Sequence, residues 1–266
     1  MGILKQLLKE IEDEKLNKIL KMPYQQFVDN FKDIASDPAV TAILNAGTTD
    51  GKPNDEKIQV VRKFISADDL RPTQNVIGFA QSLDDILTDK FGSLKSMLDG
   101  KAKFPTPLVT YNGEYIIDGH HRWSQSYVAN PEVKLDCFDL RGKLEPLEML
   151  KVIQLAIAAD VGQIKIAAAK GVNLLIATED EVKTNVMNKL TDNALELFVD
   201  KGIGTTKDDV ANYIWNNVKN MQKSNAPIQN APDRTVMPQT DISPNYADIL
   251  KKGSVNFINP KKKDIK

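Results

Sequence analysis

A two-residue turn between two β-favouring stretches constrains the fold of this chain more than any other feature. Residues 108–111 (LVTY) and 114–117 (EYII) flank Asn112-Gly113. Both central residues of a two-residue hairpin need a positive φ angle, which asparagine and glycine adopt most readily. We therefore expect residues 108–117 to form an antiparallel β-hairpin.

The chain after the hairpin has the pattern of a helix followed by a strand. Residues 120–129 contain no helix breaker, and Asn130-Pro131 stops them. In residues 133–137 apolar and polar side chains alternate, which is typical of a half-buried strand. We also expect a strand at residues 58–65, a turn at Leu70-Arg71-Pro72 and short helices up to Leu98. The local order, β-β-α-β, predicts a mixed core of the α+β class.

Most of the remaining sequence has helical periodicity. Residues 2–21 are amphipathic, and Thr178 followed by Glu181 is a capping-box pattern that starts a helix. The expected helices are residues 2–21, 24–35, 38–47, 146–160, 163–170, 178–190, 192–201 and 206–221. We divide the chain into an N-terminal helical arm (1–50) that ends in a polar linker (47–55), an α+β core (56–142), a helical segment (143–223) and an extended tail (224–266).

The composition limits what the chain is expected to bind. Hydrophobic residues make up 41% and charged residues 27% of the chain, and the formal net charge is −1. These values predict no strong attraction to nucleic acid or to a membrane surface. No apolar run approaches the roughly 18 residues of a membrane span and no secretion signal is recognised, so we expect a cytoplasmic protein. The single cysteine, Cys137, cannot form an internal disulfide, and we expect it to be a small buried residue.

Both histidines of the chain lie next to each other, in a turn between a strand and a helix. His120 and His121 follow Gly119 and precede Arg122. A helix that starts here leaves its first backbone N–H groups unpaired, with the positive end of the helix dipole behind them. Phosphate is the usual anion at such a position, and the Arg122 guanidinium can add a charge-assisted contact. The turn therefore predicts a phosphate-binding site. An imidazole can also donate a hydrogen bond or move a proton near neutral pH, so one of the two histidines is a candidate for a further role.

Several side chains near this turn have more than one interpretation. Asp118 is interpreted as a helix cap, as a partner that orients an imidazole, or as a ligand of nucleotide-bound magnesium. A metal site made by His120 and His121 is not expected, because there is no third histidine and adjacent helical residues point about 100° apart. Trp123 and Tyr127, four residues apart on one helical face, are more typical of a core than of a platform for base stacking.

The string IDGHHRW at residues 117–123 resembles the phosphate-binding turn of the ParB/sulfiredoxin-like superfamily. The resemblance covers residues 58–139 and includes Leu70-Arg71-Pro72 after the first strand and residues 105–109 (PTPLV) before the hairpin. The longer strings LRPTQN and DGHHRWSQ, together with MPQTD in the tail, are similar to bacteriophage-encoded ParB-like proteins in particular.

The resemblance implies a nucleotide-binding protein with a ParB/sulfiredoxin-like fold. It implies that Gly119, His120, His121 and Arg122 bind the phosphates of a nucleoside di- or triphosphate together with Mg²⁺. It further implies that the nucleotide is hydrolysed or its phosphoryl group transferred, with His121, Asp118 and His120 as candidate catalytic residues. By analogy with the family, the secondary phosphate-binding and nucleotide-binding candidates are Arg71, Thr73, Gln74, Ser93 and Ser96. A phage origin would place the protein in the host cytoplasm or in the virion.

The chain also departs from known members of the superfamily. Sulfiredoxins place their catalytic cysteine immediately before the His-Arg pair, where this chain has His120, so sulfinic-acid reduction is not expected. ParB partition proteins continue with a basic helix-turn-helix, whereas residues 143–223 contain no arginine, and we expect no specific DNA binding. Free-serine kinases of the superfamily have an acidic residue after the proline equivalent to Pro72, where this chain has Thr73, so kinase activity stays open but has no support from these residues.

Two other functions compete with nucleotide binding. One is a ParB-like nuclease with His120 or His121 as general base, although the near-neutral charge of the chain counts against it. The other is a non-catalytic component of a phage assembly, in which the N-terminal helix and the C-terminal tail contact other protein chains. The long segments outside a small core favour this last function more than a catalytic one.

Overall fold

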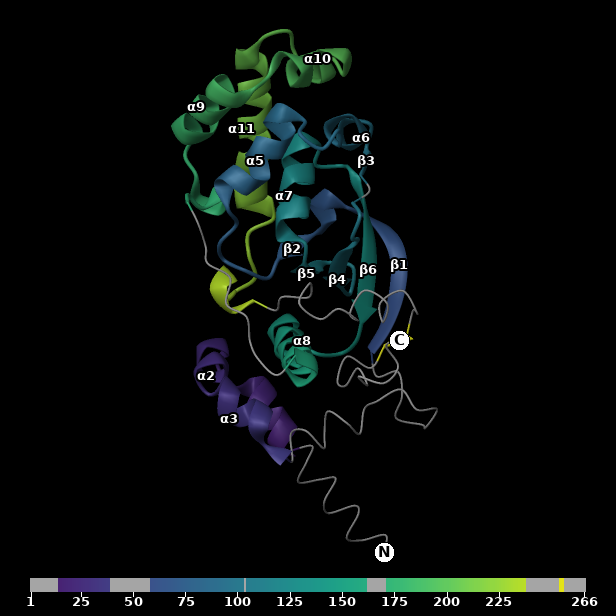
Figure 1. The fold of residues 1–266 in the computed structure, drawn as a ribbon, viewed down its shortest axis with the longest axis vertical. Coiled ribbons are helices and arrows are strands. Elements are labelled where there is room, and N and C mark those ends of the chain that lie inside the picture. Colours follow the sequence, from purple (N-terminus) through teal and green to yellow (C-terminus); the bar gives the residue numbers. More distant parts are fainter. Residues whose placement is uncertain (1–13, 39–57, 103, 162–170, 238–253, 256–266) are drawn as a thin grey trace, which may run out of the picture. The chain divides into compact units, whose positions relative to one another are not determined.

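The structure is a computed structural model that describes residues 14–38, 58–102, 104–161, 171–237 and 254–255 (Figure 1). The chain divides into two compact units, each assembled from separate segments. Residues 62–139 and 168–234 form one, called the core unit here, and residues 1–61, 140–167 and 235–266 form the other, called the terminal unit. The segments expected from composition and the units defined by contact are thus different divisions of the chain.

The core unit contains most of a mixed β-sheet. Its boundaries at residues 62 and 139 leave the start of the first strand and the end of the sixth strand in the terminal unit. The strand order is β2-β5-β4-β6-β1, β3 pairs with β6, and the pairs β2–β5 and β3–β6 are parallel whereas β4–β5 is antiparallel. The strands are β1 Ile58–Ser66, β2 Arg71–Pro72, β3 Lys101–Ala102, β4 Leu108–Tyr111, β5 Tyr115–Asp118 and β6 Lys134–Arg141. The structure confirms the α+β class. It also corrects the turn expected at Leu70-Arg71-Pro72, because β5 offers a parallel partner to Arg71 and Pro72.

The predicted hairpin is confirmed, and a third strand holds its turn in place. Asn112 has φ 52° and Gly113 has φ 73°, as the two-residue turn requires. Asp139, on β6, accepts hydrogen bonds from the backbone N–H of Gly113 at 2.7 Å and from the Thr110 hydroxyl at 2.9 Å. A buried carboxylate thus ties the turn to the neighbouring strand, which stabilises the register of β4 and β5.

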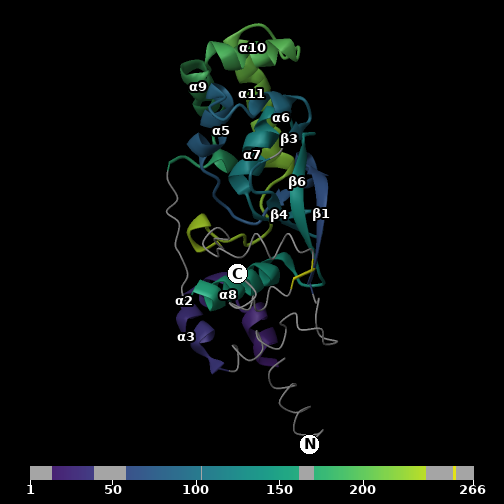
Figure 2. The same ribbon diagram turned by 45° about the vertical axis from the view of Figure 1, so that its right-hand side comes forward.

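Helices α5, α6 and α11 of the core unit pack against α7 (Figures 1 and 2). The predicted core residues are confirmed: Trp123 and Tyr127 are buried, with ring centroids 5.6 Å apart, and Trp123 Nε1 donates to the Ala67 carbonyl at 2.8 Å. The helical elements are η1 Ala67–Asp69, α5 Phe79–Thr88, α6 Leu94–Leu98, α7 His120–Ala129, η2 Leu174–Ile176, α9 Glu179–Lys189, α10 Asp192–Asp200 and α11 Lys207–Ser224. The last four lie far along the chain but complete the same hydrophobic core.

Capping boxes start two of these helices. At α9 the Thr178 side chain accepts from the Glu181 N–H and Glu181 accepts from the Thr178 N–H, as predicted. At α11 Thr206 and Asp209 make the same reciprocal pair. Both caps satisfy N–H groups that a helix start leaves unpaired, so the starts of α9 and α11 follow from local sequence.

The terminal unit contains helices that pack on one apolar helix. The expected helix at residues 24–35 is divided at Asn30 into α2 Tyr24–Asp29 and α3 Phe31–Ser36, and both pack against α8 Pro146–Val161. The Lys151 side chain of α8 is buried and donates to the carbonyl of Leu20, near the end of the helical residues 14–21, and to that of Met22, which follows them. Asn30, with φ −99° and ψ 7°, lies outside helical geometry and separates the two helices, which helical periodicity does not reveal.

The remaining expectations for the terminal unit are tested only in part. β7 Ser254–Val255 pairs antiparallel with Ile58 and Gln59 at the start of β1. Outside the described residues lie residues 2–13 of the expected helix at 2–21, residues 39–47 of the expected helix at 38–47, the expected helix at 163–170, the linker and most of the tail. None of the helices that the structure describes is long and apolar enough to cross a membrane.

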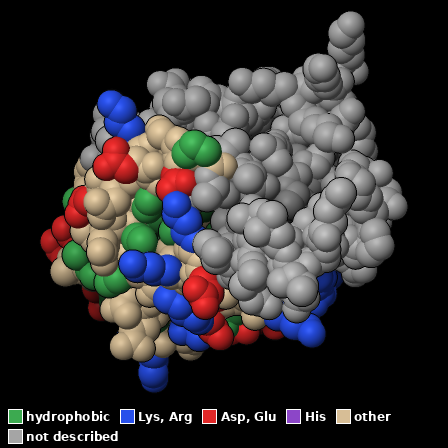
Figure 3. Space-filling view, turned by 90° about the horizontal axis from the view of Figure 1, so that it is seen from below, with side chains coloured by type: hydrophobic (Ala, Val, Ile, Leu, Met, Phe, Trp, Pro, Cys, Tyr) green, Lys and Arg blue, Asp and Glu red, His purple; other side chains and the backbone are tan. Residues whose placement is uncertain are grey.

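Charged side chains of both signs share one face of the protein. On the face drawn in Figure 3, lysine and arginine side chains of the described residues are interspersed with aspartate and glutamate. The described part of this face therefore shows no patch of a single sign.

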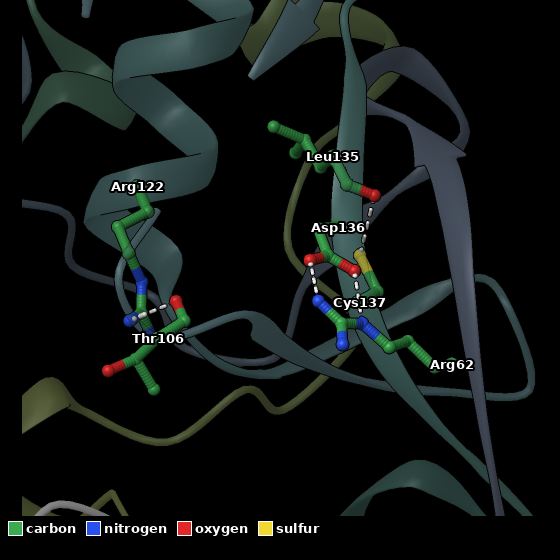
Figure 4. Close-up of polar contacts among 6 residues, drawn as sticks. All are labelled: Arg62, Thr106, Arg122, Leu135, Asp136 and Cys137. Carbon is green, nitrogen blue, oxygen red and sulfur yellow. Dashed lines mark hydrogen bonds and ion pairs between the residues drawn. The ribbon is translucent and has the colours of Figure 1, made fainter. Parts of the chain in front are cut away.

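Cys137 lies on β6 inside the core unit and is fully buried, as expected (Figure 4). Burial, together with the carboxylates of Asp139 and Asp136, raises the pKa of its thiol to about 12. Arg62 pairs with Asp136 through two hydrogen bonds, at 3.0 and 2.6 Å. Because only the thiolate is a nucleophile, Cys137 is unsuited to catalysis at neutral pH.

Candidate functional site

The turn between β5 and α7 leaves three backbone N–H groups without a helical partner. Gly119 is the N-cap of α7, with φ 95° and ψ 23°, and no side chain caps the helix. The first backbone hydrogen bond of the helix runs from Trp123 N to Gly119 O at 2.9 Å. The N–H groups of residues 120–122 therefore precede the hydrogen-bonded ladder and sit at the positive end of the helix dipole.

Glycine is required at position 119 for two separate reasons. Its left-handed backbone conformation strains any residue that has a Cβ atom. A Cβ atom here would also lie 2.9 Å from Leu108 Cγ and 2.9 Å from Arg122 Nη2. The turn thus brings the chain within contact of the Arg122 guanidinium, which only glycine permits.

The His120 imidazole is buried and tied to the end of β2. Its Nε2 atom accepts a hydrogen bond from the backbone N–H of Thr73 at 3.2 Å. Burial, the neighbouring His121 and the charges of Arg234 and Arg122 lower its pKa to about 3. His120 is therefore neutral at pH 7, with its proton on Nδ1, because Nε2 acts as the acceptor.

The His121 imidazole also accepts a hydrogen bond from a backbone N–H group, five residues beyond Thr73 in the chain. Its Nε2 atom accepts from the backbone N–H of Gly78 at 3.3 Å. Burial, followed by the charges of Arg234 and Arg122, lowers the pKa of His121 to about 4. Both histidines thus join the start of α7 to residues 73–78, and a proton transfer at either Nε2 atom would first require that bond to break.

Arg122 is held in place by two contacts that use different parts of its guanidinium. Nη1 donates to the Thr106 carbonyl oxygen at 2.9 Å (Figure 4), and Nη2 donates to Asp118 Oδ2 at 3.1 Å. The side chain is 24% exposed, and a guanidinium has five N–H donors, so donors remain for an anion. Asp118 does not cap α7; its carboxylate pairs with Arg122.

Arg234 was not found by sequence reasoning, yet it lies at the same turn. Its Nη1 atom donates to Gln81 Oε1 at 2.8 Å. A Cβ atom on Gly78 would lie 3.7 Å from Arg234 Nη1 and 3.2 Å from His121 Nε2, so this arginine and the imidazole border the same glycine. No local pattern could have indicated Arg234, because only the fold brings residue 234 to this turn.

Of the secondary candidates, Arg71, Thr73 and Gln74 are consecutive or nearly so on β2 and the loop that follows it, whereas Ser93 is the N-cap of α6 and Ser96 lies within that helix. Thr73 lies at the turn through its bond to His120, and the buried Gln74 next to it donates to the Val76 carbonyl at 2.8 Å. Arg71, on β2, has its Nη1 atom 3.8 Å from Glu114 Oε1.

Ser93 and Ser96 lie elsewhere in the core unit, at the start of α6. Asn130, which follows the last residue of α7, donates to the Met97 carbonyl of α6 at 3.2 Å. α6 is therefore next to the C-terminal end of α7, about 14 Å along the helix axis from His120. The structure does not bring these two serines to the turn.

The described residues contain no group of three or more His, Cys, Asp or Glu side chains placed to hold a metal ion. A magnesium ion carried by a nucleotide needs fewer protein ligands, because the phosphates supply oxygen atoms as well. Asp118 is the carboxylate at the turn that fits this role.

Comparison of the chain with protein-family models, curated proteins and solved structures finds no match. The resemblance to the ParB/sulfiredoxin-like superfamily therefore stays a prediction.

Proposed function

We propose that this chain binds the phosphates of a nucleoside di- or triphosphate at the turn formed by residues 119–122. The observation that carries the proposal is the convergence of unpaired N–H groups at the start of α7 with the Arg122 guanidinium above Gly119. The helix start attracts negative charge, and a guanidinium matches the geometry of phosphate oxygens.

Each residue of the turn has a separate role in this proposal. The N–H groups of residues 120–122 donate to phosphate oxygens, and Arg122 donates from the guanidinium N–H groups that Thr106 and Asp118 do not use. His120 and His121 act as positioning residues, because their Nε2 atoms fasten the turn to Thr73 and Gly78. The ParB/sulfiredoxin-like resemblance adds Mg²⁺ bound with the nucleotide, for which Asp118 supplies a carboxylate. Hydrolysis or phosphoryl transfer is the reaction class implied by the same resemblance.

Replacing Arg122 with alanine is expected to lower nucleotide affinity by more than tenfold, because a charge-assisted contact contributes roughly 1.5–3 kcal/mol. The measurement is calorimetric titration of the full chain with ATP, ADP, CTP and GTP, with and without Mg²⁺. Lys95→Ala is the matched control, since it removes one positive charge from an exposed position on α6. The melting temperature of each variant separates binding from folding. Equal affinity of Arg122→Ala and the native chain would refute the proposed site.

Asp118→Asn is expected to raise affinity for the nucleotide when Mg²⁺ is absent. The carboxylate of Asp118 neutralises Arg122 and repels phosphate, and the amide retains a hydrogen-bond acceptor for the guanidinium. If Asp118 also holds nucleotide-bound Mg²⁺, the same variant should lose most of the gain that Mg²⁺ gives to the native chain. The readout is the ratio of affinities with and without Mg²⁺. Weaker binding in both conditions would contradict the assigned role of Asp118.

Product analysis of the same samples distinguishes the competing functions. Release of phosphate from a bound nucleotide would assign hydrolysis, and its absence would favour a binding or assembly role. Mg²⁺-dependent cleavage of DNA that is lost in His121→Ala would replace the present proposal with the nuclease.

A further inference from the structure

The segment that follows α11 runs back along the loop that contacts the two histidines. We call residues 225–234 the return segment; it follows α11 in Figures 1 and 2. Its hydrogen bonds to residues 70–81 run from Asn225 Nδ2 to the Leu70 carbonyl at 2.9 Å, from Ile228 N to the Pro72 carbonyl at 3.2 Å, from Asn75 N to the Pro232 carbonyl at 3.0 Å and from Arg234 Nη1 to Gln81 Oε1 at 2.8 Å. The segment thus ends by placing Arg234 beside Gly78.

The charge of Arg234 is not neutralised within the described part of the chain. Arg122 has the carboxylate of Asp118 at 3.1 Å, whereas Arg234 forms no ion pair with any described residue, and its side chain is only partly exposed. Removing a cation partly from water without a counter-charge is unfavourable, and a bound anion would offset that cost. The two histidines that it faces are neutral and supply no negative charge.

The two arginines border different parts of one turn. The Arg122 guanidinium lies next to Gly119, at the start of the turn. The Arg234 guanidinium lies next to Gly78, which also neighbours the Nε2 atom of His121. Both guanidinium groups lie close enough to lower the pKa of each imidazole. In the proposed function, a single phosphate at the start of α7 would engage Arg122 and the backbone. A second anionic group linked to the first would extend toward Gly78 and engage Arg234.

We propose that Arg234 binds a second phosphoryl group of the ligand, next to the one held by residues 119–122. The site would then select ligands with two or more linked phosphoryl groups over monophosphates. This inference rests on the proposed function, because it extends the same anion site.

The test uses orthophosphate and pyrophosphate as probes, titrated into the full chain by calorimetry. We expect the native chain to bind pyrophosphate about tenfold or more tightly than orthophosphate, since one charge-assisted contact is worth that factor. Arg234→Gln should remove this preference while changing orthophosphate affinity by less than about threefold, and Arg234→Lys should retain part of it. Arg234 makes one side-chain hydrogen bond, to Gln81, so the lysine variant should fold even if the glutamine variant proves unstable.

The outcomes separate this inference from the proposed function. If the native chain binds neither probe, both are overturned. If orthophosphate binds in an Arg122-dependent manner but pyrophosphate binds no more tightly, or if Arg234→Gln and Arg234→Lys both keep the preference, only the role of Arg234 is overturned. Lys95→Ala again controls for the loss of one positive charge and should match the native chain.

Discussion

Acidification from pH 7 to pH 4 is expected to reduce the free energy of unfolding strongly, and protonation of His120 and His121 contributes to this loss. The folded protein keeps both imidazoles neutral, since burial and nearby arginines lower their pKa values from 6.5 to about 3 and about 4. In the unfolded chain both return to about 6.5. Between these values the unfolded state binds more protons than the folded state, so stability is fully retained above pH 6.5 and is lost as the pH falls.

The measurement is urea unfolding at a series of pH values for the native chain and His121→Gln. Glutamine does not titrate, and its side-chain oxygen can still accept from Gly78 N–H. The native chain should lose on the order of 2–3 kcal/mol more stability than the variant between pH 6.5 and pH 4, because each pKa unit corresponds to about 1.4 kcal/mol. The comparison cancels the carboxylates that titrate in the same range. Parallel stability curves for the two proteins would show that His121 is not held neutral by the fold.

Replacing Gly119 with alanine is expected to destabilise the protein by roughly 2–4 kcal/mol and to remove anion binding. One part of the cost is the left-handed backbone, and the other is the contact of the new Cβ atom with Leu108 Cγ at 2.9 Å. Displacement of Arg122, which the same atom would touch, accounts for the expected loss of binding.

Gly202→Ala is the matched control for this experiment. Gly202 has φ 72°, similar to the 95° of Gly119, but no heavy atom lies within 4 Å of the position that its Cβ would take. The control should therefore show the backbone cost alone, about 1 kcal/mol. Thermal melting of both variants gives the difference. An equal loss of stability in the two would mean that the space around Gly119 adapts without cost.

Local sequence predicted those elements whose determinants lie within a few residues of each other. The Asn112-Gly113 turn needs positive φ angles at adjacent positions, and the Thr178 cap needs an acceptor three residues away. α7 is confirmed from His120 to Ala129 for the same reason. The candidate phosphate-binding turn before it could be proposed from sequence because the glycine, the helix start and the arginine are consecutive.

Tertiary contacts decided the features that depend on distant segments. The pair Arg71-Pro72 forms a strand only because β5 offers a parallel partner, and one expected helix divides at Asn30 into two helices that both pack on α8. Proximity of two residues in space is not encoded by either residue alone. For this reason the sequence indicated a candidate anion site at Gly119–Arg122, whereas only the fold placed Arg234 beside it and turned both histidines toward backbone N–H groups, where they are held neutral.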